Sequence, residues 1–120
     1  MSRSVSRRPA RVLAMQVLYA LEMGCGTVAD ALTAAIDGVK LLPDQQKYAV
    51  QLIDLSLSQR EENRKEIGEA LSNWDYERVA AIDRLLLEIG LTEIKHFVEV
   101  PPKVILSEYQ SIAKKFSTEE

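Results

Sequence analysis

The chain has 120 residues, 47% of them hydrophobic and 28% charged, with a net charge of −3, a balance that is typical of one globular domain and argues against a general polyanion-binding protein. Its one cysteine, Cys25, excludes a disulfide within the chain, and we therefore expect a reducing, cytoplasmic setting. Charges interrupt every apolar stretch well short of the roughly 18 residues that a membrane span needs, so we expect neither membrane insertion nor export.

Positive charge is concentrated at the beginning of the chain. Arg3, Arg7, Arg8 and Arg11 all precede the first acidic residue, Glu22, whereas the rest of the chain carries eleven bases and eighteen acids. This separation focuses a positive field at one end, and the acidic remainder discourages indiscriminate binding. The alternative interpretation is a solvated, frayed terminus.

Helical spacing of apolar residues recurs along the whole chain, without internal repeats or sustained strand alternation. This spacing predicts six helices, at about 9–23, 28–36, 43–58, 61–71, 77–97 and 102–116. Ser6, Thr27 and Asp75 are the predicted N-caps of the first, second and fifth helices. The sequence therefore predicts one all-α domain over residues 1–120, a helical bundle in two small subdomains at about 1–73 and 74–120.

The first predicted helix has two faces of different chemistry. Its inward face consists of Leu13, Val17 and Leu21. The opposite stripe consists of Arg8, Arg11, Met15, Tyr19 and Glu22. Because guanidinium groups pair with phosphates and a tyrosine ring stacks on unpaired bases, this stripe favours single-stranded RNA over duplex RNA. The alternative interpretation packs Met15 and Tyr19 against another helix and leaves the arginines in solvent.

The later helices are predicted to build the core. The fifth is apolar over most of its circumference, with a narrow polar strip of Arg84, Glu88 and Lys95. The sixth is amphipathic, and its predicted inward residues are Ile105, Leu106, Tyr109, Ile112, Ala113 and Phe116. The fourth mixes acids with bases, which is typical of a solvated helix face with charge pairs along it.

No pattern of catalytic or metal-binding residues is present in the sequence. There is no Gly-rich phosphate loop, and one histidine with one cysteine does not make the usual zinc site. His96 lies near the end of the fifth helix, where a protonated imidazole suits the helix dipole. We therefore predict a binding protein that is not an enzyme and that uses no cofactor and no metal.

Three separated segments, in the same order and spacing, resemble the bacterial NusB family. Residues 7–19 (RRPARVLAMQVLY) are similar to the R-R-x-A-R-x-x-A-x-Q-x-L-Y opening of that family. Residues 82–94 (IDRLLLEIGLTEI) are similar to its I-D-R-A-I-L-R-I-A-L-Y-E-L segment. Residues 100–105 (VPPKVI) and 112–116 (IAKKF) are similar to its I-P-P-K-V-V and L-A-K-K-F elements.

The resemblance implies an all-α fold and a role in processive transcription antitermination. Members of the family pair with NusE, a small-subunit ribosomal protein, and the pair binds the single-stranded boxA element of nascent rRNA leaders in the transcription elongation complex. Carried over residue by residue, the RNA side consists of Arg7, Arg8, Arg11 and Tyr19. Lys103 matches the lysine of the family's P-x-K motif, which either contacts a phosphate or is solvated at the start of the helix. Glu77 and Asp83 fall near the junction of the RNA and NusE surfaces.

The sequence departs from the family pattern at several positions. Thr92, Ser107 and Ser117 stand where the family usually has tyrosine, asparagine and glycine. The family's F-V-N-G-V-L-D helix would follow Glu120, and residues 117–120 (STEE) look like a helix start. We therefore expect an uncovered apolar surface through which the chain either associates with itself or binds hydrophobic dyes. The candidates for that surface are Leu87, Leu91, Ile105 and Phe116.

Two other functions are compatible with the residues. The chain could be the NusB-like RNA-binding domain of an rRNA cytosine methyltransferase, which a downstream S-adenosylmethionine-binding Rossmann region would indicate. It could also be a purely structural helical adaptor with an incidental basic arm, in which case its RNA affinity would show no salt dependence.

Overall fold

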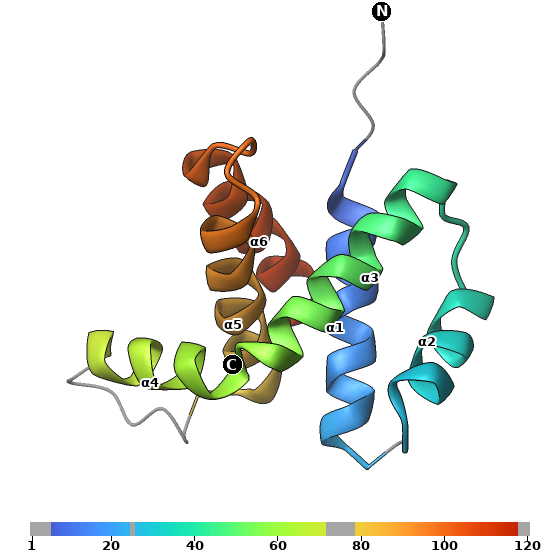
Figure 1. The fold of residues 1–120 in the computed structure, drawn as a ribbon, viewed down its shortest axis with the longest axis horizontal. Helices are drawn as coiled ribbons and strands as arrows, with labels where there is room; N and C mark the ends of the chain where they lie inside the picture. The colour runs from blue at the N-terminus through green and yellow to red at the C-terminus, as the bar shows by residue number, and fades with distance from the viewer. Residues whose placement is uncertain (1–5, 25, 72–78, 118–120) are drawn as a thin grey trace, which may run out of the picture. The chain divides into compact units, whose positions relative to one another are not determined.

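The computed structural model describes residues 6–24, 26–71 and 79–117, and these residues form six helices without a strand (Figure 1). The helices are α1 (Arg8–Glu22), α2 (Val28–Asp37), α3 (Pro43–Ser58), α4 (Arg60–Ala70), α5 (Ala81–His96) and α6 (Pro102–Phe116). The all-α prediction is confirmed. The chain divides into two compact units, Met1–Ile53 and Asp54–Glu120, so the division lies inside α3, whereas the sequence suggested one near residue 74.

The helix limits follow local signals in most cases. α3 and α6 have their predicted bounds, and α1, α2 and α4 differ from prediction by one residue at one or both ends. The prediction for α5 is wrong at its start, because Val79 and Ala80 are not helical and Ala80 has an extended backbone with ψ 145. The first residue of the apolar pattern is Ile82, so burial gives no reason to begin the helix earlier. The predicted cap Asp75 lies outside the described residues.

The first unit has its core along the inward face of α1, which packs against α2. The predicted inward residues Leu13 and Val17 are 1% and 0% exposed. The turn into α2 requires glycine, since Gly24 and Gly26 have φ of 92° and 111°. Thr27 then caps α2 as predicted, because its Oγ1 accepts a hydrogen bond from the Asp30 amide at 3.1 Å.

The second unit is built around α5, which packs against both α4 and α6. This double contact explains why α5 is apolar over most of its circumference, because two faces of the helix need partners. Of the predicted inward residues on α6, Ile105, Tyr109 and Ile112 are buried. Leu106 is instead 56% exposed, so the prediction that it faces inward is wrong. It follows the buried Ile105 by one position, about 100° around the helix.

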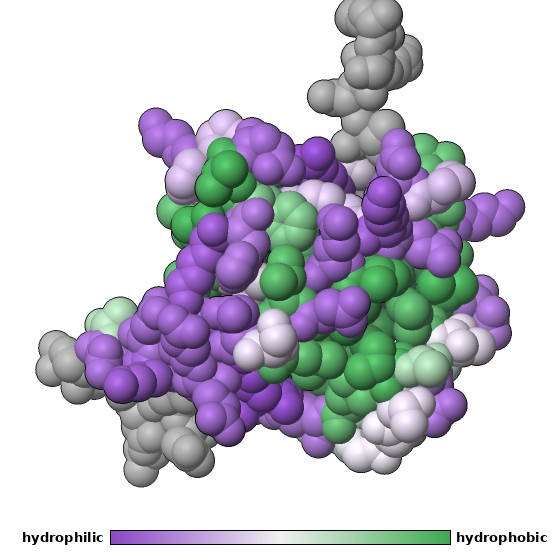
Figure 2. Space-filling view, viewed as in Figure 1, coloured by the Kyte–Doolittle hydropathy of each residue, from purple (hydrophilic) through white to green (hydrophobic). Residues whose placement is uncertain are grey.

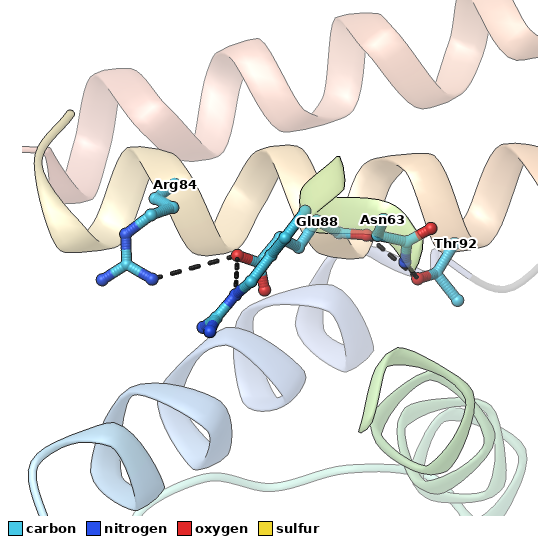
Figure 3. A network of polar contacts seen from close by, with 5 residues as sticks. Asn63, Arg84, Glu88 and Thr92 are labelled. Carbon is cyan, nitrogen blue, oxygen red and sulfur yellow. Dashed lines mark hydrogen bonds and ion pairs between the residues drawn. The ribbon is translucent and has the colours of Figure 1, made fainter. Parts of the chain in front are cut away.

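The contact between α4 and α5 is polar (Figure 3). Asn63 is fully buried, and its Nδ2 donates a hydrogen bond to Thr92 Oγ1 at 2.8 Å. The Thr92 hydroxyl in turn donates to the backbone carbonyl of Glu88 at 2.9 Å. Thr92, which stands where the resembled family usually has tyrosine, is thus a fully buried partner of Asn63.

Charged side chains extend this contact. Arg64 Nε lies 2.9 Å from Glu88 Oε2, and Arg84 Nη1 lies 3.9 Å from the same oxygen (Figure 3). Lys95 Nζ donates to Glu66 Oε2 at 3.0 Å. The polar strip predicted on α5 is thus the side that meets α4, and Glu88 within it is only 4% exposed. The face of α4 that is seen in Figure 2 is hydrophilic, in agreement with its predicted solvated face.

Candidate nucleic-acid interface

The chain just before α1 is fixed against the start of α3, within the first unit. Gln45 Nε2 donates a hydrogen bond to the Ser6 carbonyl at 2.7 Å, and Gln45 Oε1 accepts one from the Leu42 amide at 2.9 Å. One turn further along α3, the ring of Tyr48 lies beneath Arg7, whose guanidinium carbon is 4.6 Å from the ring centroid. The start of the basic segment is therefore held by tertiary contacts at Ser6 and Arg7.

Gln45 and Tyr48 were missed by the sequence reasoning. Their side chains are 9% and 8% exposed, and they are three residues apart on one face of α3. That spacing is a sequence signal for a buried face, and a glutamine within it indicates a polar group that needs a partner. The partner itself is 39 residues away along the chain, so no local pattern could identify it.

The outward stripe predicted on α1 is exposed at its ends and buried in the middle. Arg8 is exposed, and Tyr19 is 37% exposed. They lie on the same side of the helix, about 16 Å apart along its axis. Arg11 and Met15, by contrast, are only 3% and 2% exposed. For Met15 the packing interpretation is therefore correct, whereas Tyr19 remains at the surface.

The predicted site residues of the second unit lie at the beginnings of two helices. Lys103 is exposed in the first turn of α6, a turn that contains no acidic residue and therefore has the uncompensated positive end of the helix dipole. Asp83 is half-buried in the first turn of α5, and its Oδ2 accepts a hydrogen bond from Ser117 Oγ at 3.2 Å. The serine that replaces the family's glycine thus ties the end of α6 to α5. Glu77 lies outside the described residues.

Asp83 also borders an apolar groove of about 710 Å³ in the second unit, lined by residues of α4, α5 and α6. Three of the four residues expected on an uncovered apolar surface, Leu87, Leu91 and Ile105, line this groove, but Ile105 is itself 0% exposed, so the expectation that it is uncovered is wrong. The fourth, Phe116, is not among the lining residues. Leu87 and Leu106 are the most accessible of its large aliphatic side chains, at 42% and 56% exposed.

Within 6–24, 26–71 and 79–117, no three side chains of His, Cys, Asp or Glu are grouped so that they could hold a metal ion. Across those same ranges, none of the helices combines the length and apolarity that crossing a membrane requires.

The fold is similar to solved NusB structures. The chain matches the structure of T. maritima NusB with a TM-score of 0.85 at 20% identity, over 98% of this chain and 82% of that one. It matches a chain in the crystal structure of the antitermination factors NusB and NusE in complex with dsRNA with a TM-score of 0.79 at 24% identity, over 94% of this chain and 84% of that one.

Relatives identified by sequence share a higher identity with the chain than these solved structures do. The chain is 37% identical to the transcription antitermination protein NusB of Myxococcus xanthus, over 96% of this chain and 85% of the relative. It is 40% identical to the protein of that name from Salinibacter ruber, over 94% and 71% respectively. These relatives are transcription antitermination proteins rather than enzymes, in agreement with the prediction of a non-enzymatic protein. The sequence model of the NusB family matches residues 8–120, and the chain therefore belongs to the NusB family.

Proposed function

We propose that this protein is a transcription antitermination factor of the bacterial cytoplasm that binds, together with NusE, a boxA-like single-stranded RNA in nascent rRNA leaders. The observation that carries the proposal is the family match over residues 8–120, which includes the basic start of α1. Relatives at 37% and 40% identity are antitermination proteins, and one structural neighbour comes from the crystal structure of NusB and NusE in complex with dsRNA. Pairing with NusE within the transcription elongation complex follows from this assignment.

The RNA-contacting residues proposed in the first unit are Arg7, Arg8 and Tyr19. Arg7 is held over Tyr48 at 4.6 Å, so little side-chain freedom is lost when its guanidinium meets a phosphate. Arg8 is exposed beside it, and Tyr19 offers part of its ring to an unpaired base on the same side of α1. Arg11 is only 3% exposed, so its proposed role is structural: it holds α1 in place.

The second unit contributes the remaining proposed contacts. Lys103 lies at the positive end of α6, where a phosphate would meet both the lysine and the helix dipole. Asp83 is proposed to face NusE, because its carboxylate is half-buried beside an apolar groove and is oriented by Ser117. A carboxylate held in one orientation can fix how two proteins align at their interface and so make the interaction specific.

The proposal is tested by titrating a labelled boxA-like RNA with the protein, with and without NusE, at several salt concentrations. We expect NusE to tighten binding, and log affinity to fall linearly with log salt as phosphate contacts release counterions. A scrambled single strand and a duplex of the boxA sequence are the controls. Equal affinity for the boxA-like and scrambled strands would remove the boxA part of the proposal, and absence of RNA binding at low salt in the presence of NusE would overturn it entirely.

A further inference from the structure

The first unit has a shallow apolar hollow where α2 ends and α3 begins. It consists of two adjoining depressions of about 410 and 510 Å³, which share Leu41 and Gln46 among their lining residues. Five aliphatic side chains and Pro43 make up six of its ten lining residues, and two of the aliphatic side chains are well exposed, Val39 at 38% and Leu42 at 55%. We call the surface formed by these lining residues, which fall within residues 36–51, the α2–α3 hollow.

The α2–α3 hollow uses a different face of α3 from the nucleic-acid interface. Gln45 and Tyr48 contact the chain before α1. The residues of α3 that line the hollow include Gln46, Lys47 and Val50, which follow Pro43 by three, four and seven positions and so form a separate stripe. A ligand in the hollow would therefore not displace the contacts that position Arg7.

Charge and side-chain type indicate what this surface binds. Both charged residues that line it, within the described part of the chain, are lysines, Lys40 and Lys47, and both are exposed. Asp37 and Asp44 are close to them in sequence but do not line the hollow. The lining contains neither an arginine nor an aromatic ring, the two residue types that pair with phosphates in a fork and stack on bases. An apolar floor with lysines fits an acidic peptide better than RNA.

We propose that the α2–α3 hollow docks an acidic amphipathic helix of a protein partner. Aliphatic side chains spaced by three and four residues on that helix would cover Val39, Leu42 and Val50, and its carboxylates would pair with the two lysines. The pairs between lysines and carboxylates would set the orientation of the helix and its association rate, whereas burial of the aliphatic side chains would supply most of the affinity. This proposal does not rest on RNA binding or on NusE.

The test uses the full chain, labelled with 15N, and an amidated peptide of about 15 residues, long enough to form a helix. The peptide has leucines at every third and fourth position and glutamates on the flanking positions. A matched peptide has glutamine in place of every glutamate. We expect shifted resonances to be confined to residues 36–51, and the neutral peptide to bind more weakly because it leaves the lysines unpaired.

Variants of the chain make the test specific. Because Lys40 and Lys47 are exposed, the double variant Lys40→Glu with Lys47→Glu should stay folded by circular dichroism and lower the peptide affinity at least about tenfold, since glutamates there would repel the carboxylates of the peptide. Lys65→Glu, at an exposed position on α4, is the matched control and should leave the affinity unchanged. The proposal is overturned by lack of binding, by equal affinity for the two peptides, or by shifts that map elsewhere. A short oligouridylate that shifts residues 36–51 more strongly than the peptide would assign the hollow to RNA instead.

Discussion

The guanidinium carbon of Arg7 lies 4.6 Å from the centroid of the Tyr48 ring, and this ring is itself only 8% exposed. A cation over an aromatic face is stabilised by about 0.5–1 kcal/mol at exposed sites and by more where water is excluded. The contact, together with the hydrogen bond from Gln45 to the Ser6 carbonyl, argues against a frayed start for the residues that immediately precede α1. The positive charge there has a defined position.

The first prediction concerns this pair. If Tyr48 positions Arg7 for RNA, Tyr48→Leu should weaken binding of the boxA-like RNA about threefold, the equivalent of about 0.7 kcal/mol, because the cation loses its platform. Arg7→Ala should weaken binding by at least as much, and the double variant should be no weaker than Arg7→Ala alone. The measurement is a double-mutant cycle on RNA affinity. Fully additive losses would show that Tyr48 acts independently of Arg7.

The second prediction separates two arginines on α1. Arg8→Glu should lower RNA affinity at least about tenfold and flatten its salt dependence, because an exposed phosphate contact is reversed in sign. Arg11→Glu should chiefly lower stability, by about 3–5 kcal/mol, since its site is 3% exposed and the new charge would be buried beside the former partners of the guanidinium. Thermal melting and RNA titration of both variants are the measurements. Equal melting temperatures would contradict the structural role of Arg11.

The third prediction concerns Tyr19. Tyr19→Ala should cost about 1–3 kcal/mol in RNA binding if the ring stacks on a base. The effect on stability should be small, because the side chain is 37% exposed. Tyr19→Phe is the matched control and should retain RNA affinity, since the ring remains. A large fall in melting temperature with RNA affinity unchanged would instead identify Tyr19 as a packing residue.

The fourth prediction tests the polar contact between α4 and α5. Thr92→Val keeps the shape of the side chain but removes the hydroxyl that accepts the hydrogen bond of Asn63 at 2.8 Å. It should lower the free energy of unfolding by about 1–3 kcal/mol, because a buried amide then lacks its partner. Urea unfolding is the measurement. Ser107→Ala, at an exposed site on α6, should change stability by less than about 0.5 kcal/mol and serves as the control.

The fifth prediction concerns the apolar groove of the second unit. Leu87 and Leu106 expose 42% and 56% of their surface there, and exposed apolar patches favour association and dye binding. Replacing both by glutamine should reduce the fluorescence of a hydrophobic dye and any self-association seen by sedimentation. The melting temperature should change little, because neither residue is buried. Unchanged dye binding would show that the groove is not the accessible apolar surface.

The sequence alone determined the features that depend on neighbours within a few residues. Apolar periodicity located the six helices, and Thr27 identified the start of α2 through a capping box that spans only three residues. The inward face of α1 followed from the same period, because its buried stripe repeats every three or four positions. The resemblance to the NusB family also required only short segments, and the match over residues 8–120 confirms it.

The tertiary structure decided what lies opposite each side chain. A helical period gives the direction of Arg11 and Met15 from the axis, but it does not show that both are covered while Arg8 and Tyr19 stay at the surface. Likewise Glu88 was assigned to a polar strip, and only the packing of α4 on α5 shows that this carboxylate is buried beside Arg64. The Arg64–Glu88 contact joins residues 24 positions apart, and the Asn63–Thr92 and Gln45–Ser6 hydrogen bonds join residues 29 and 39 positions apart, separations that no local spacing encodes.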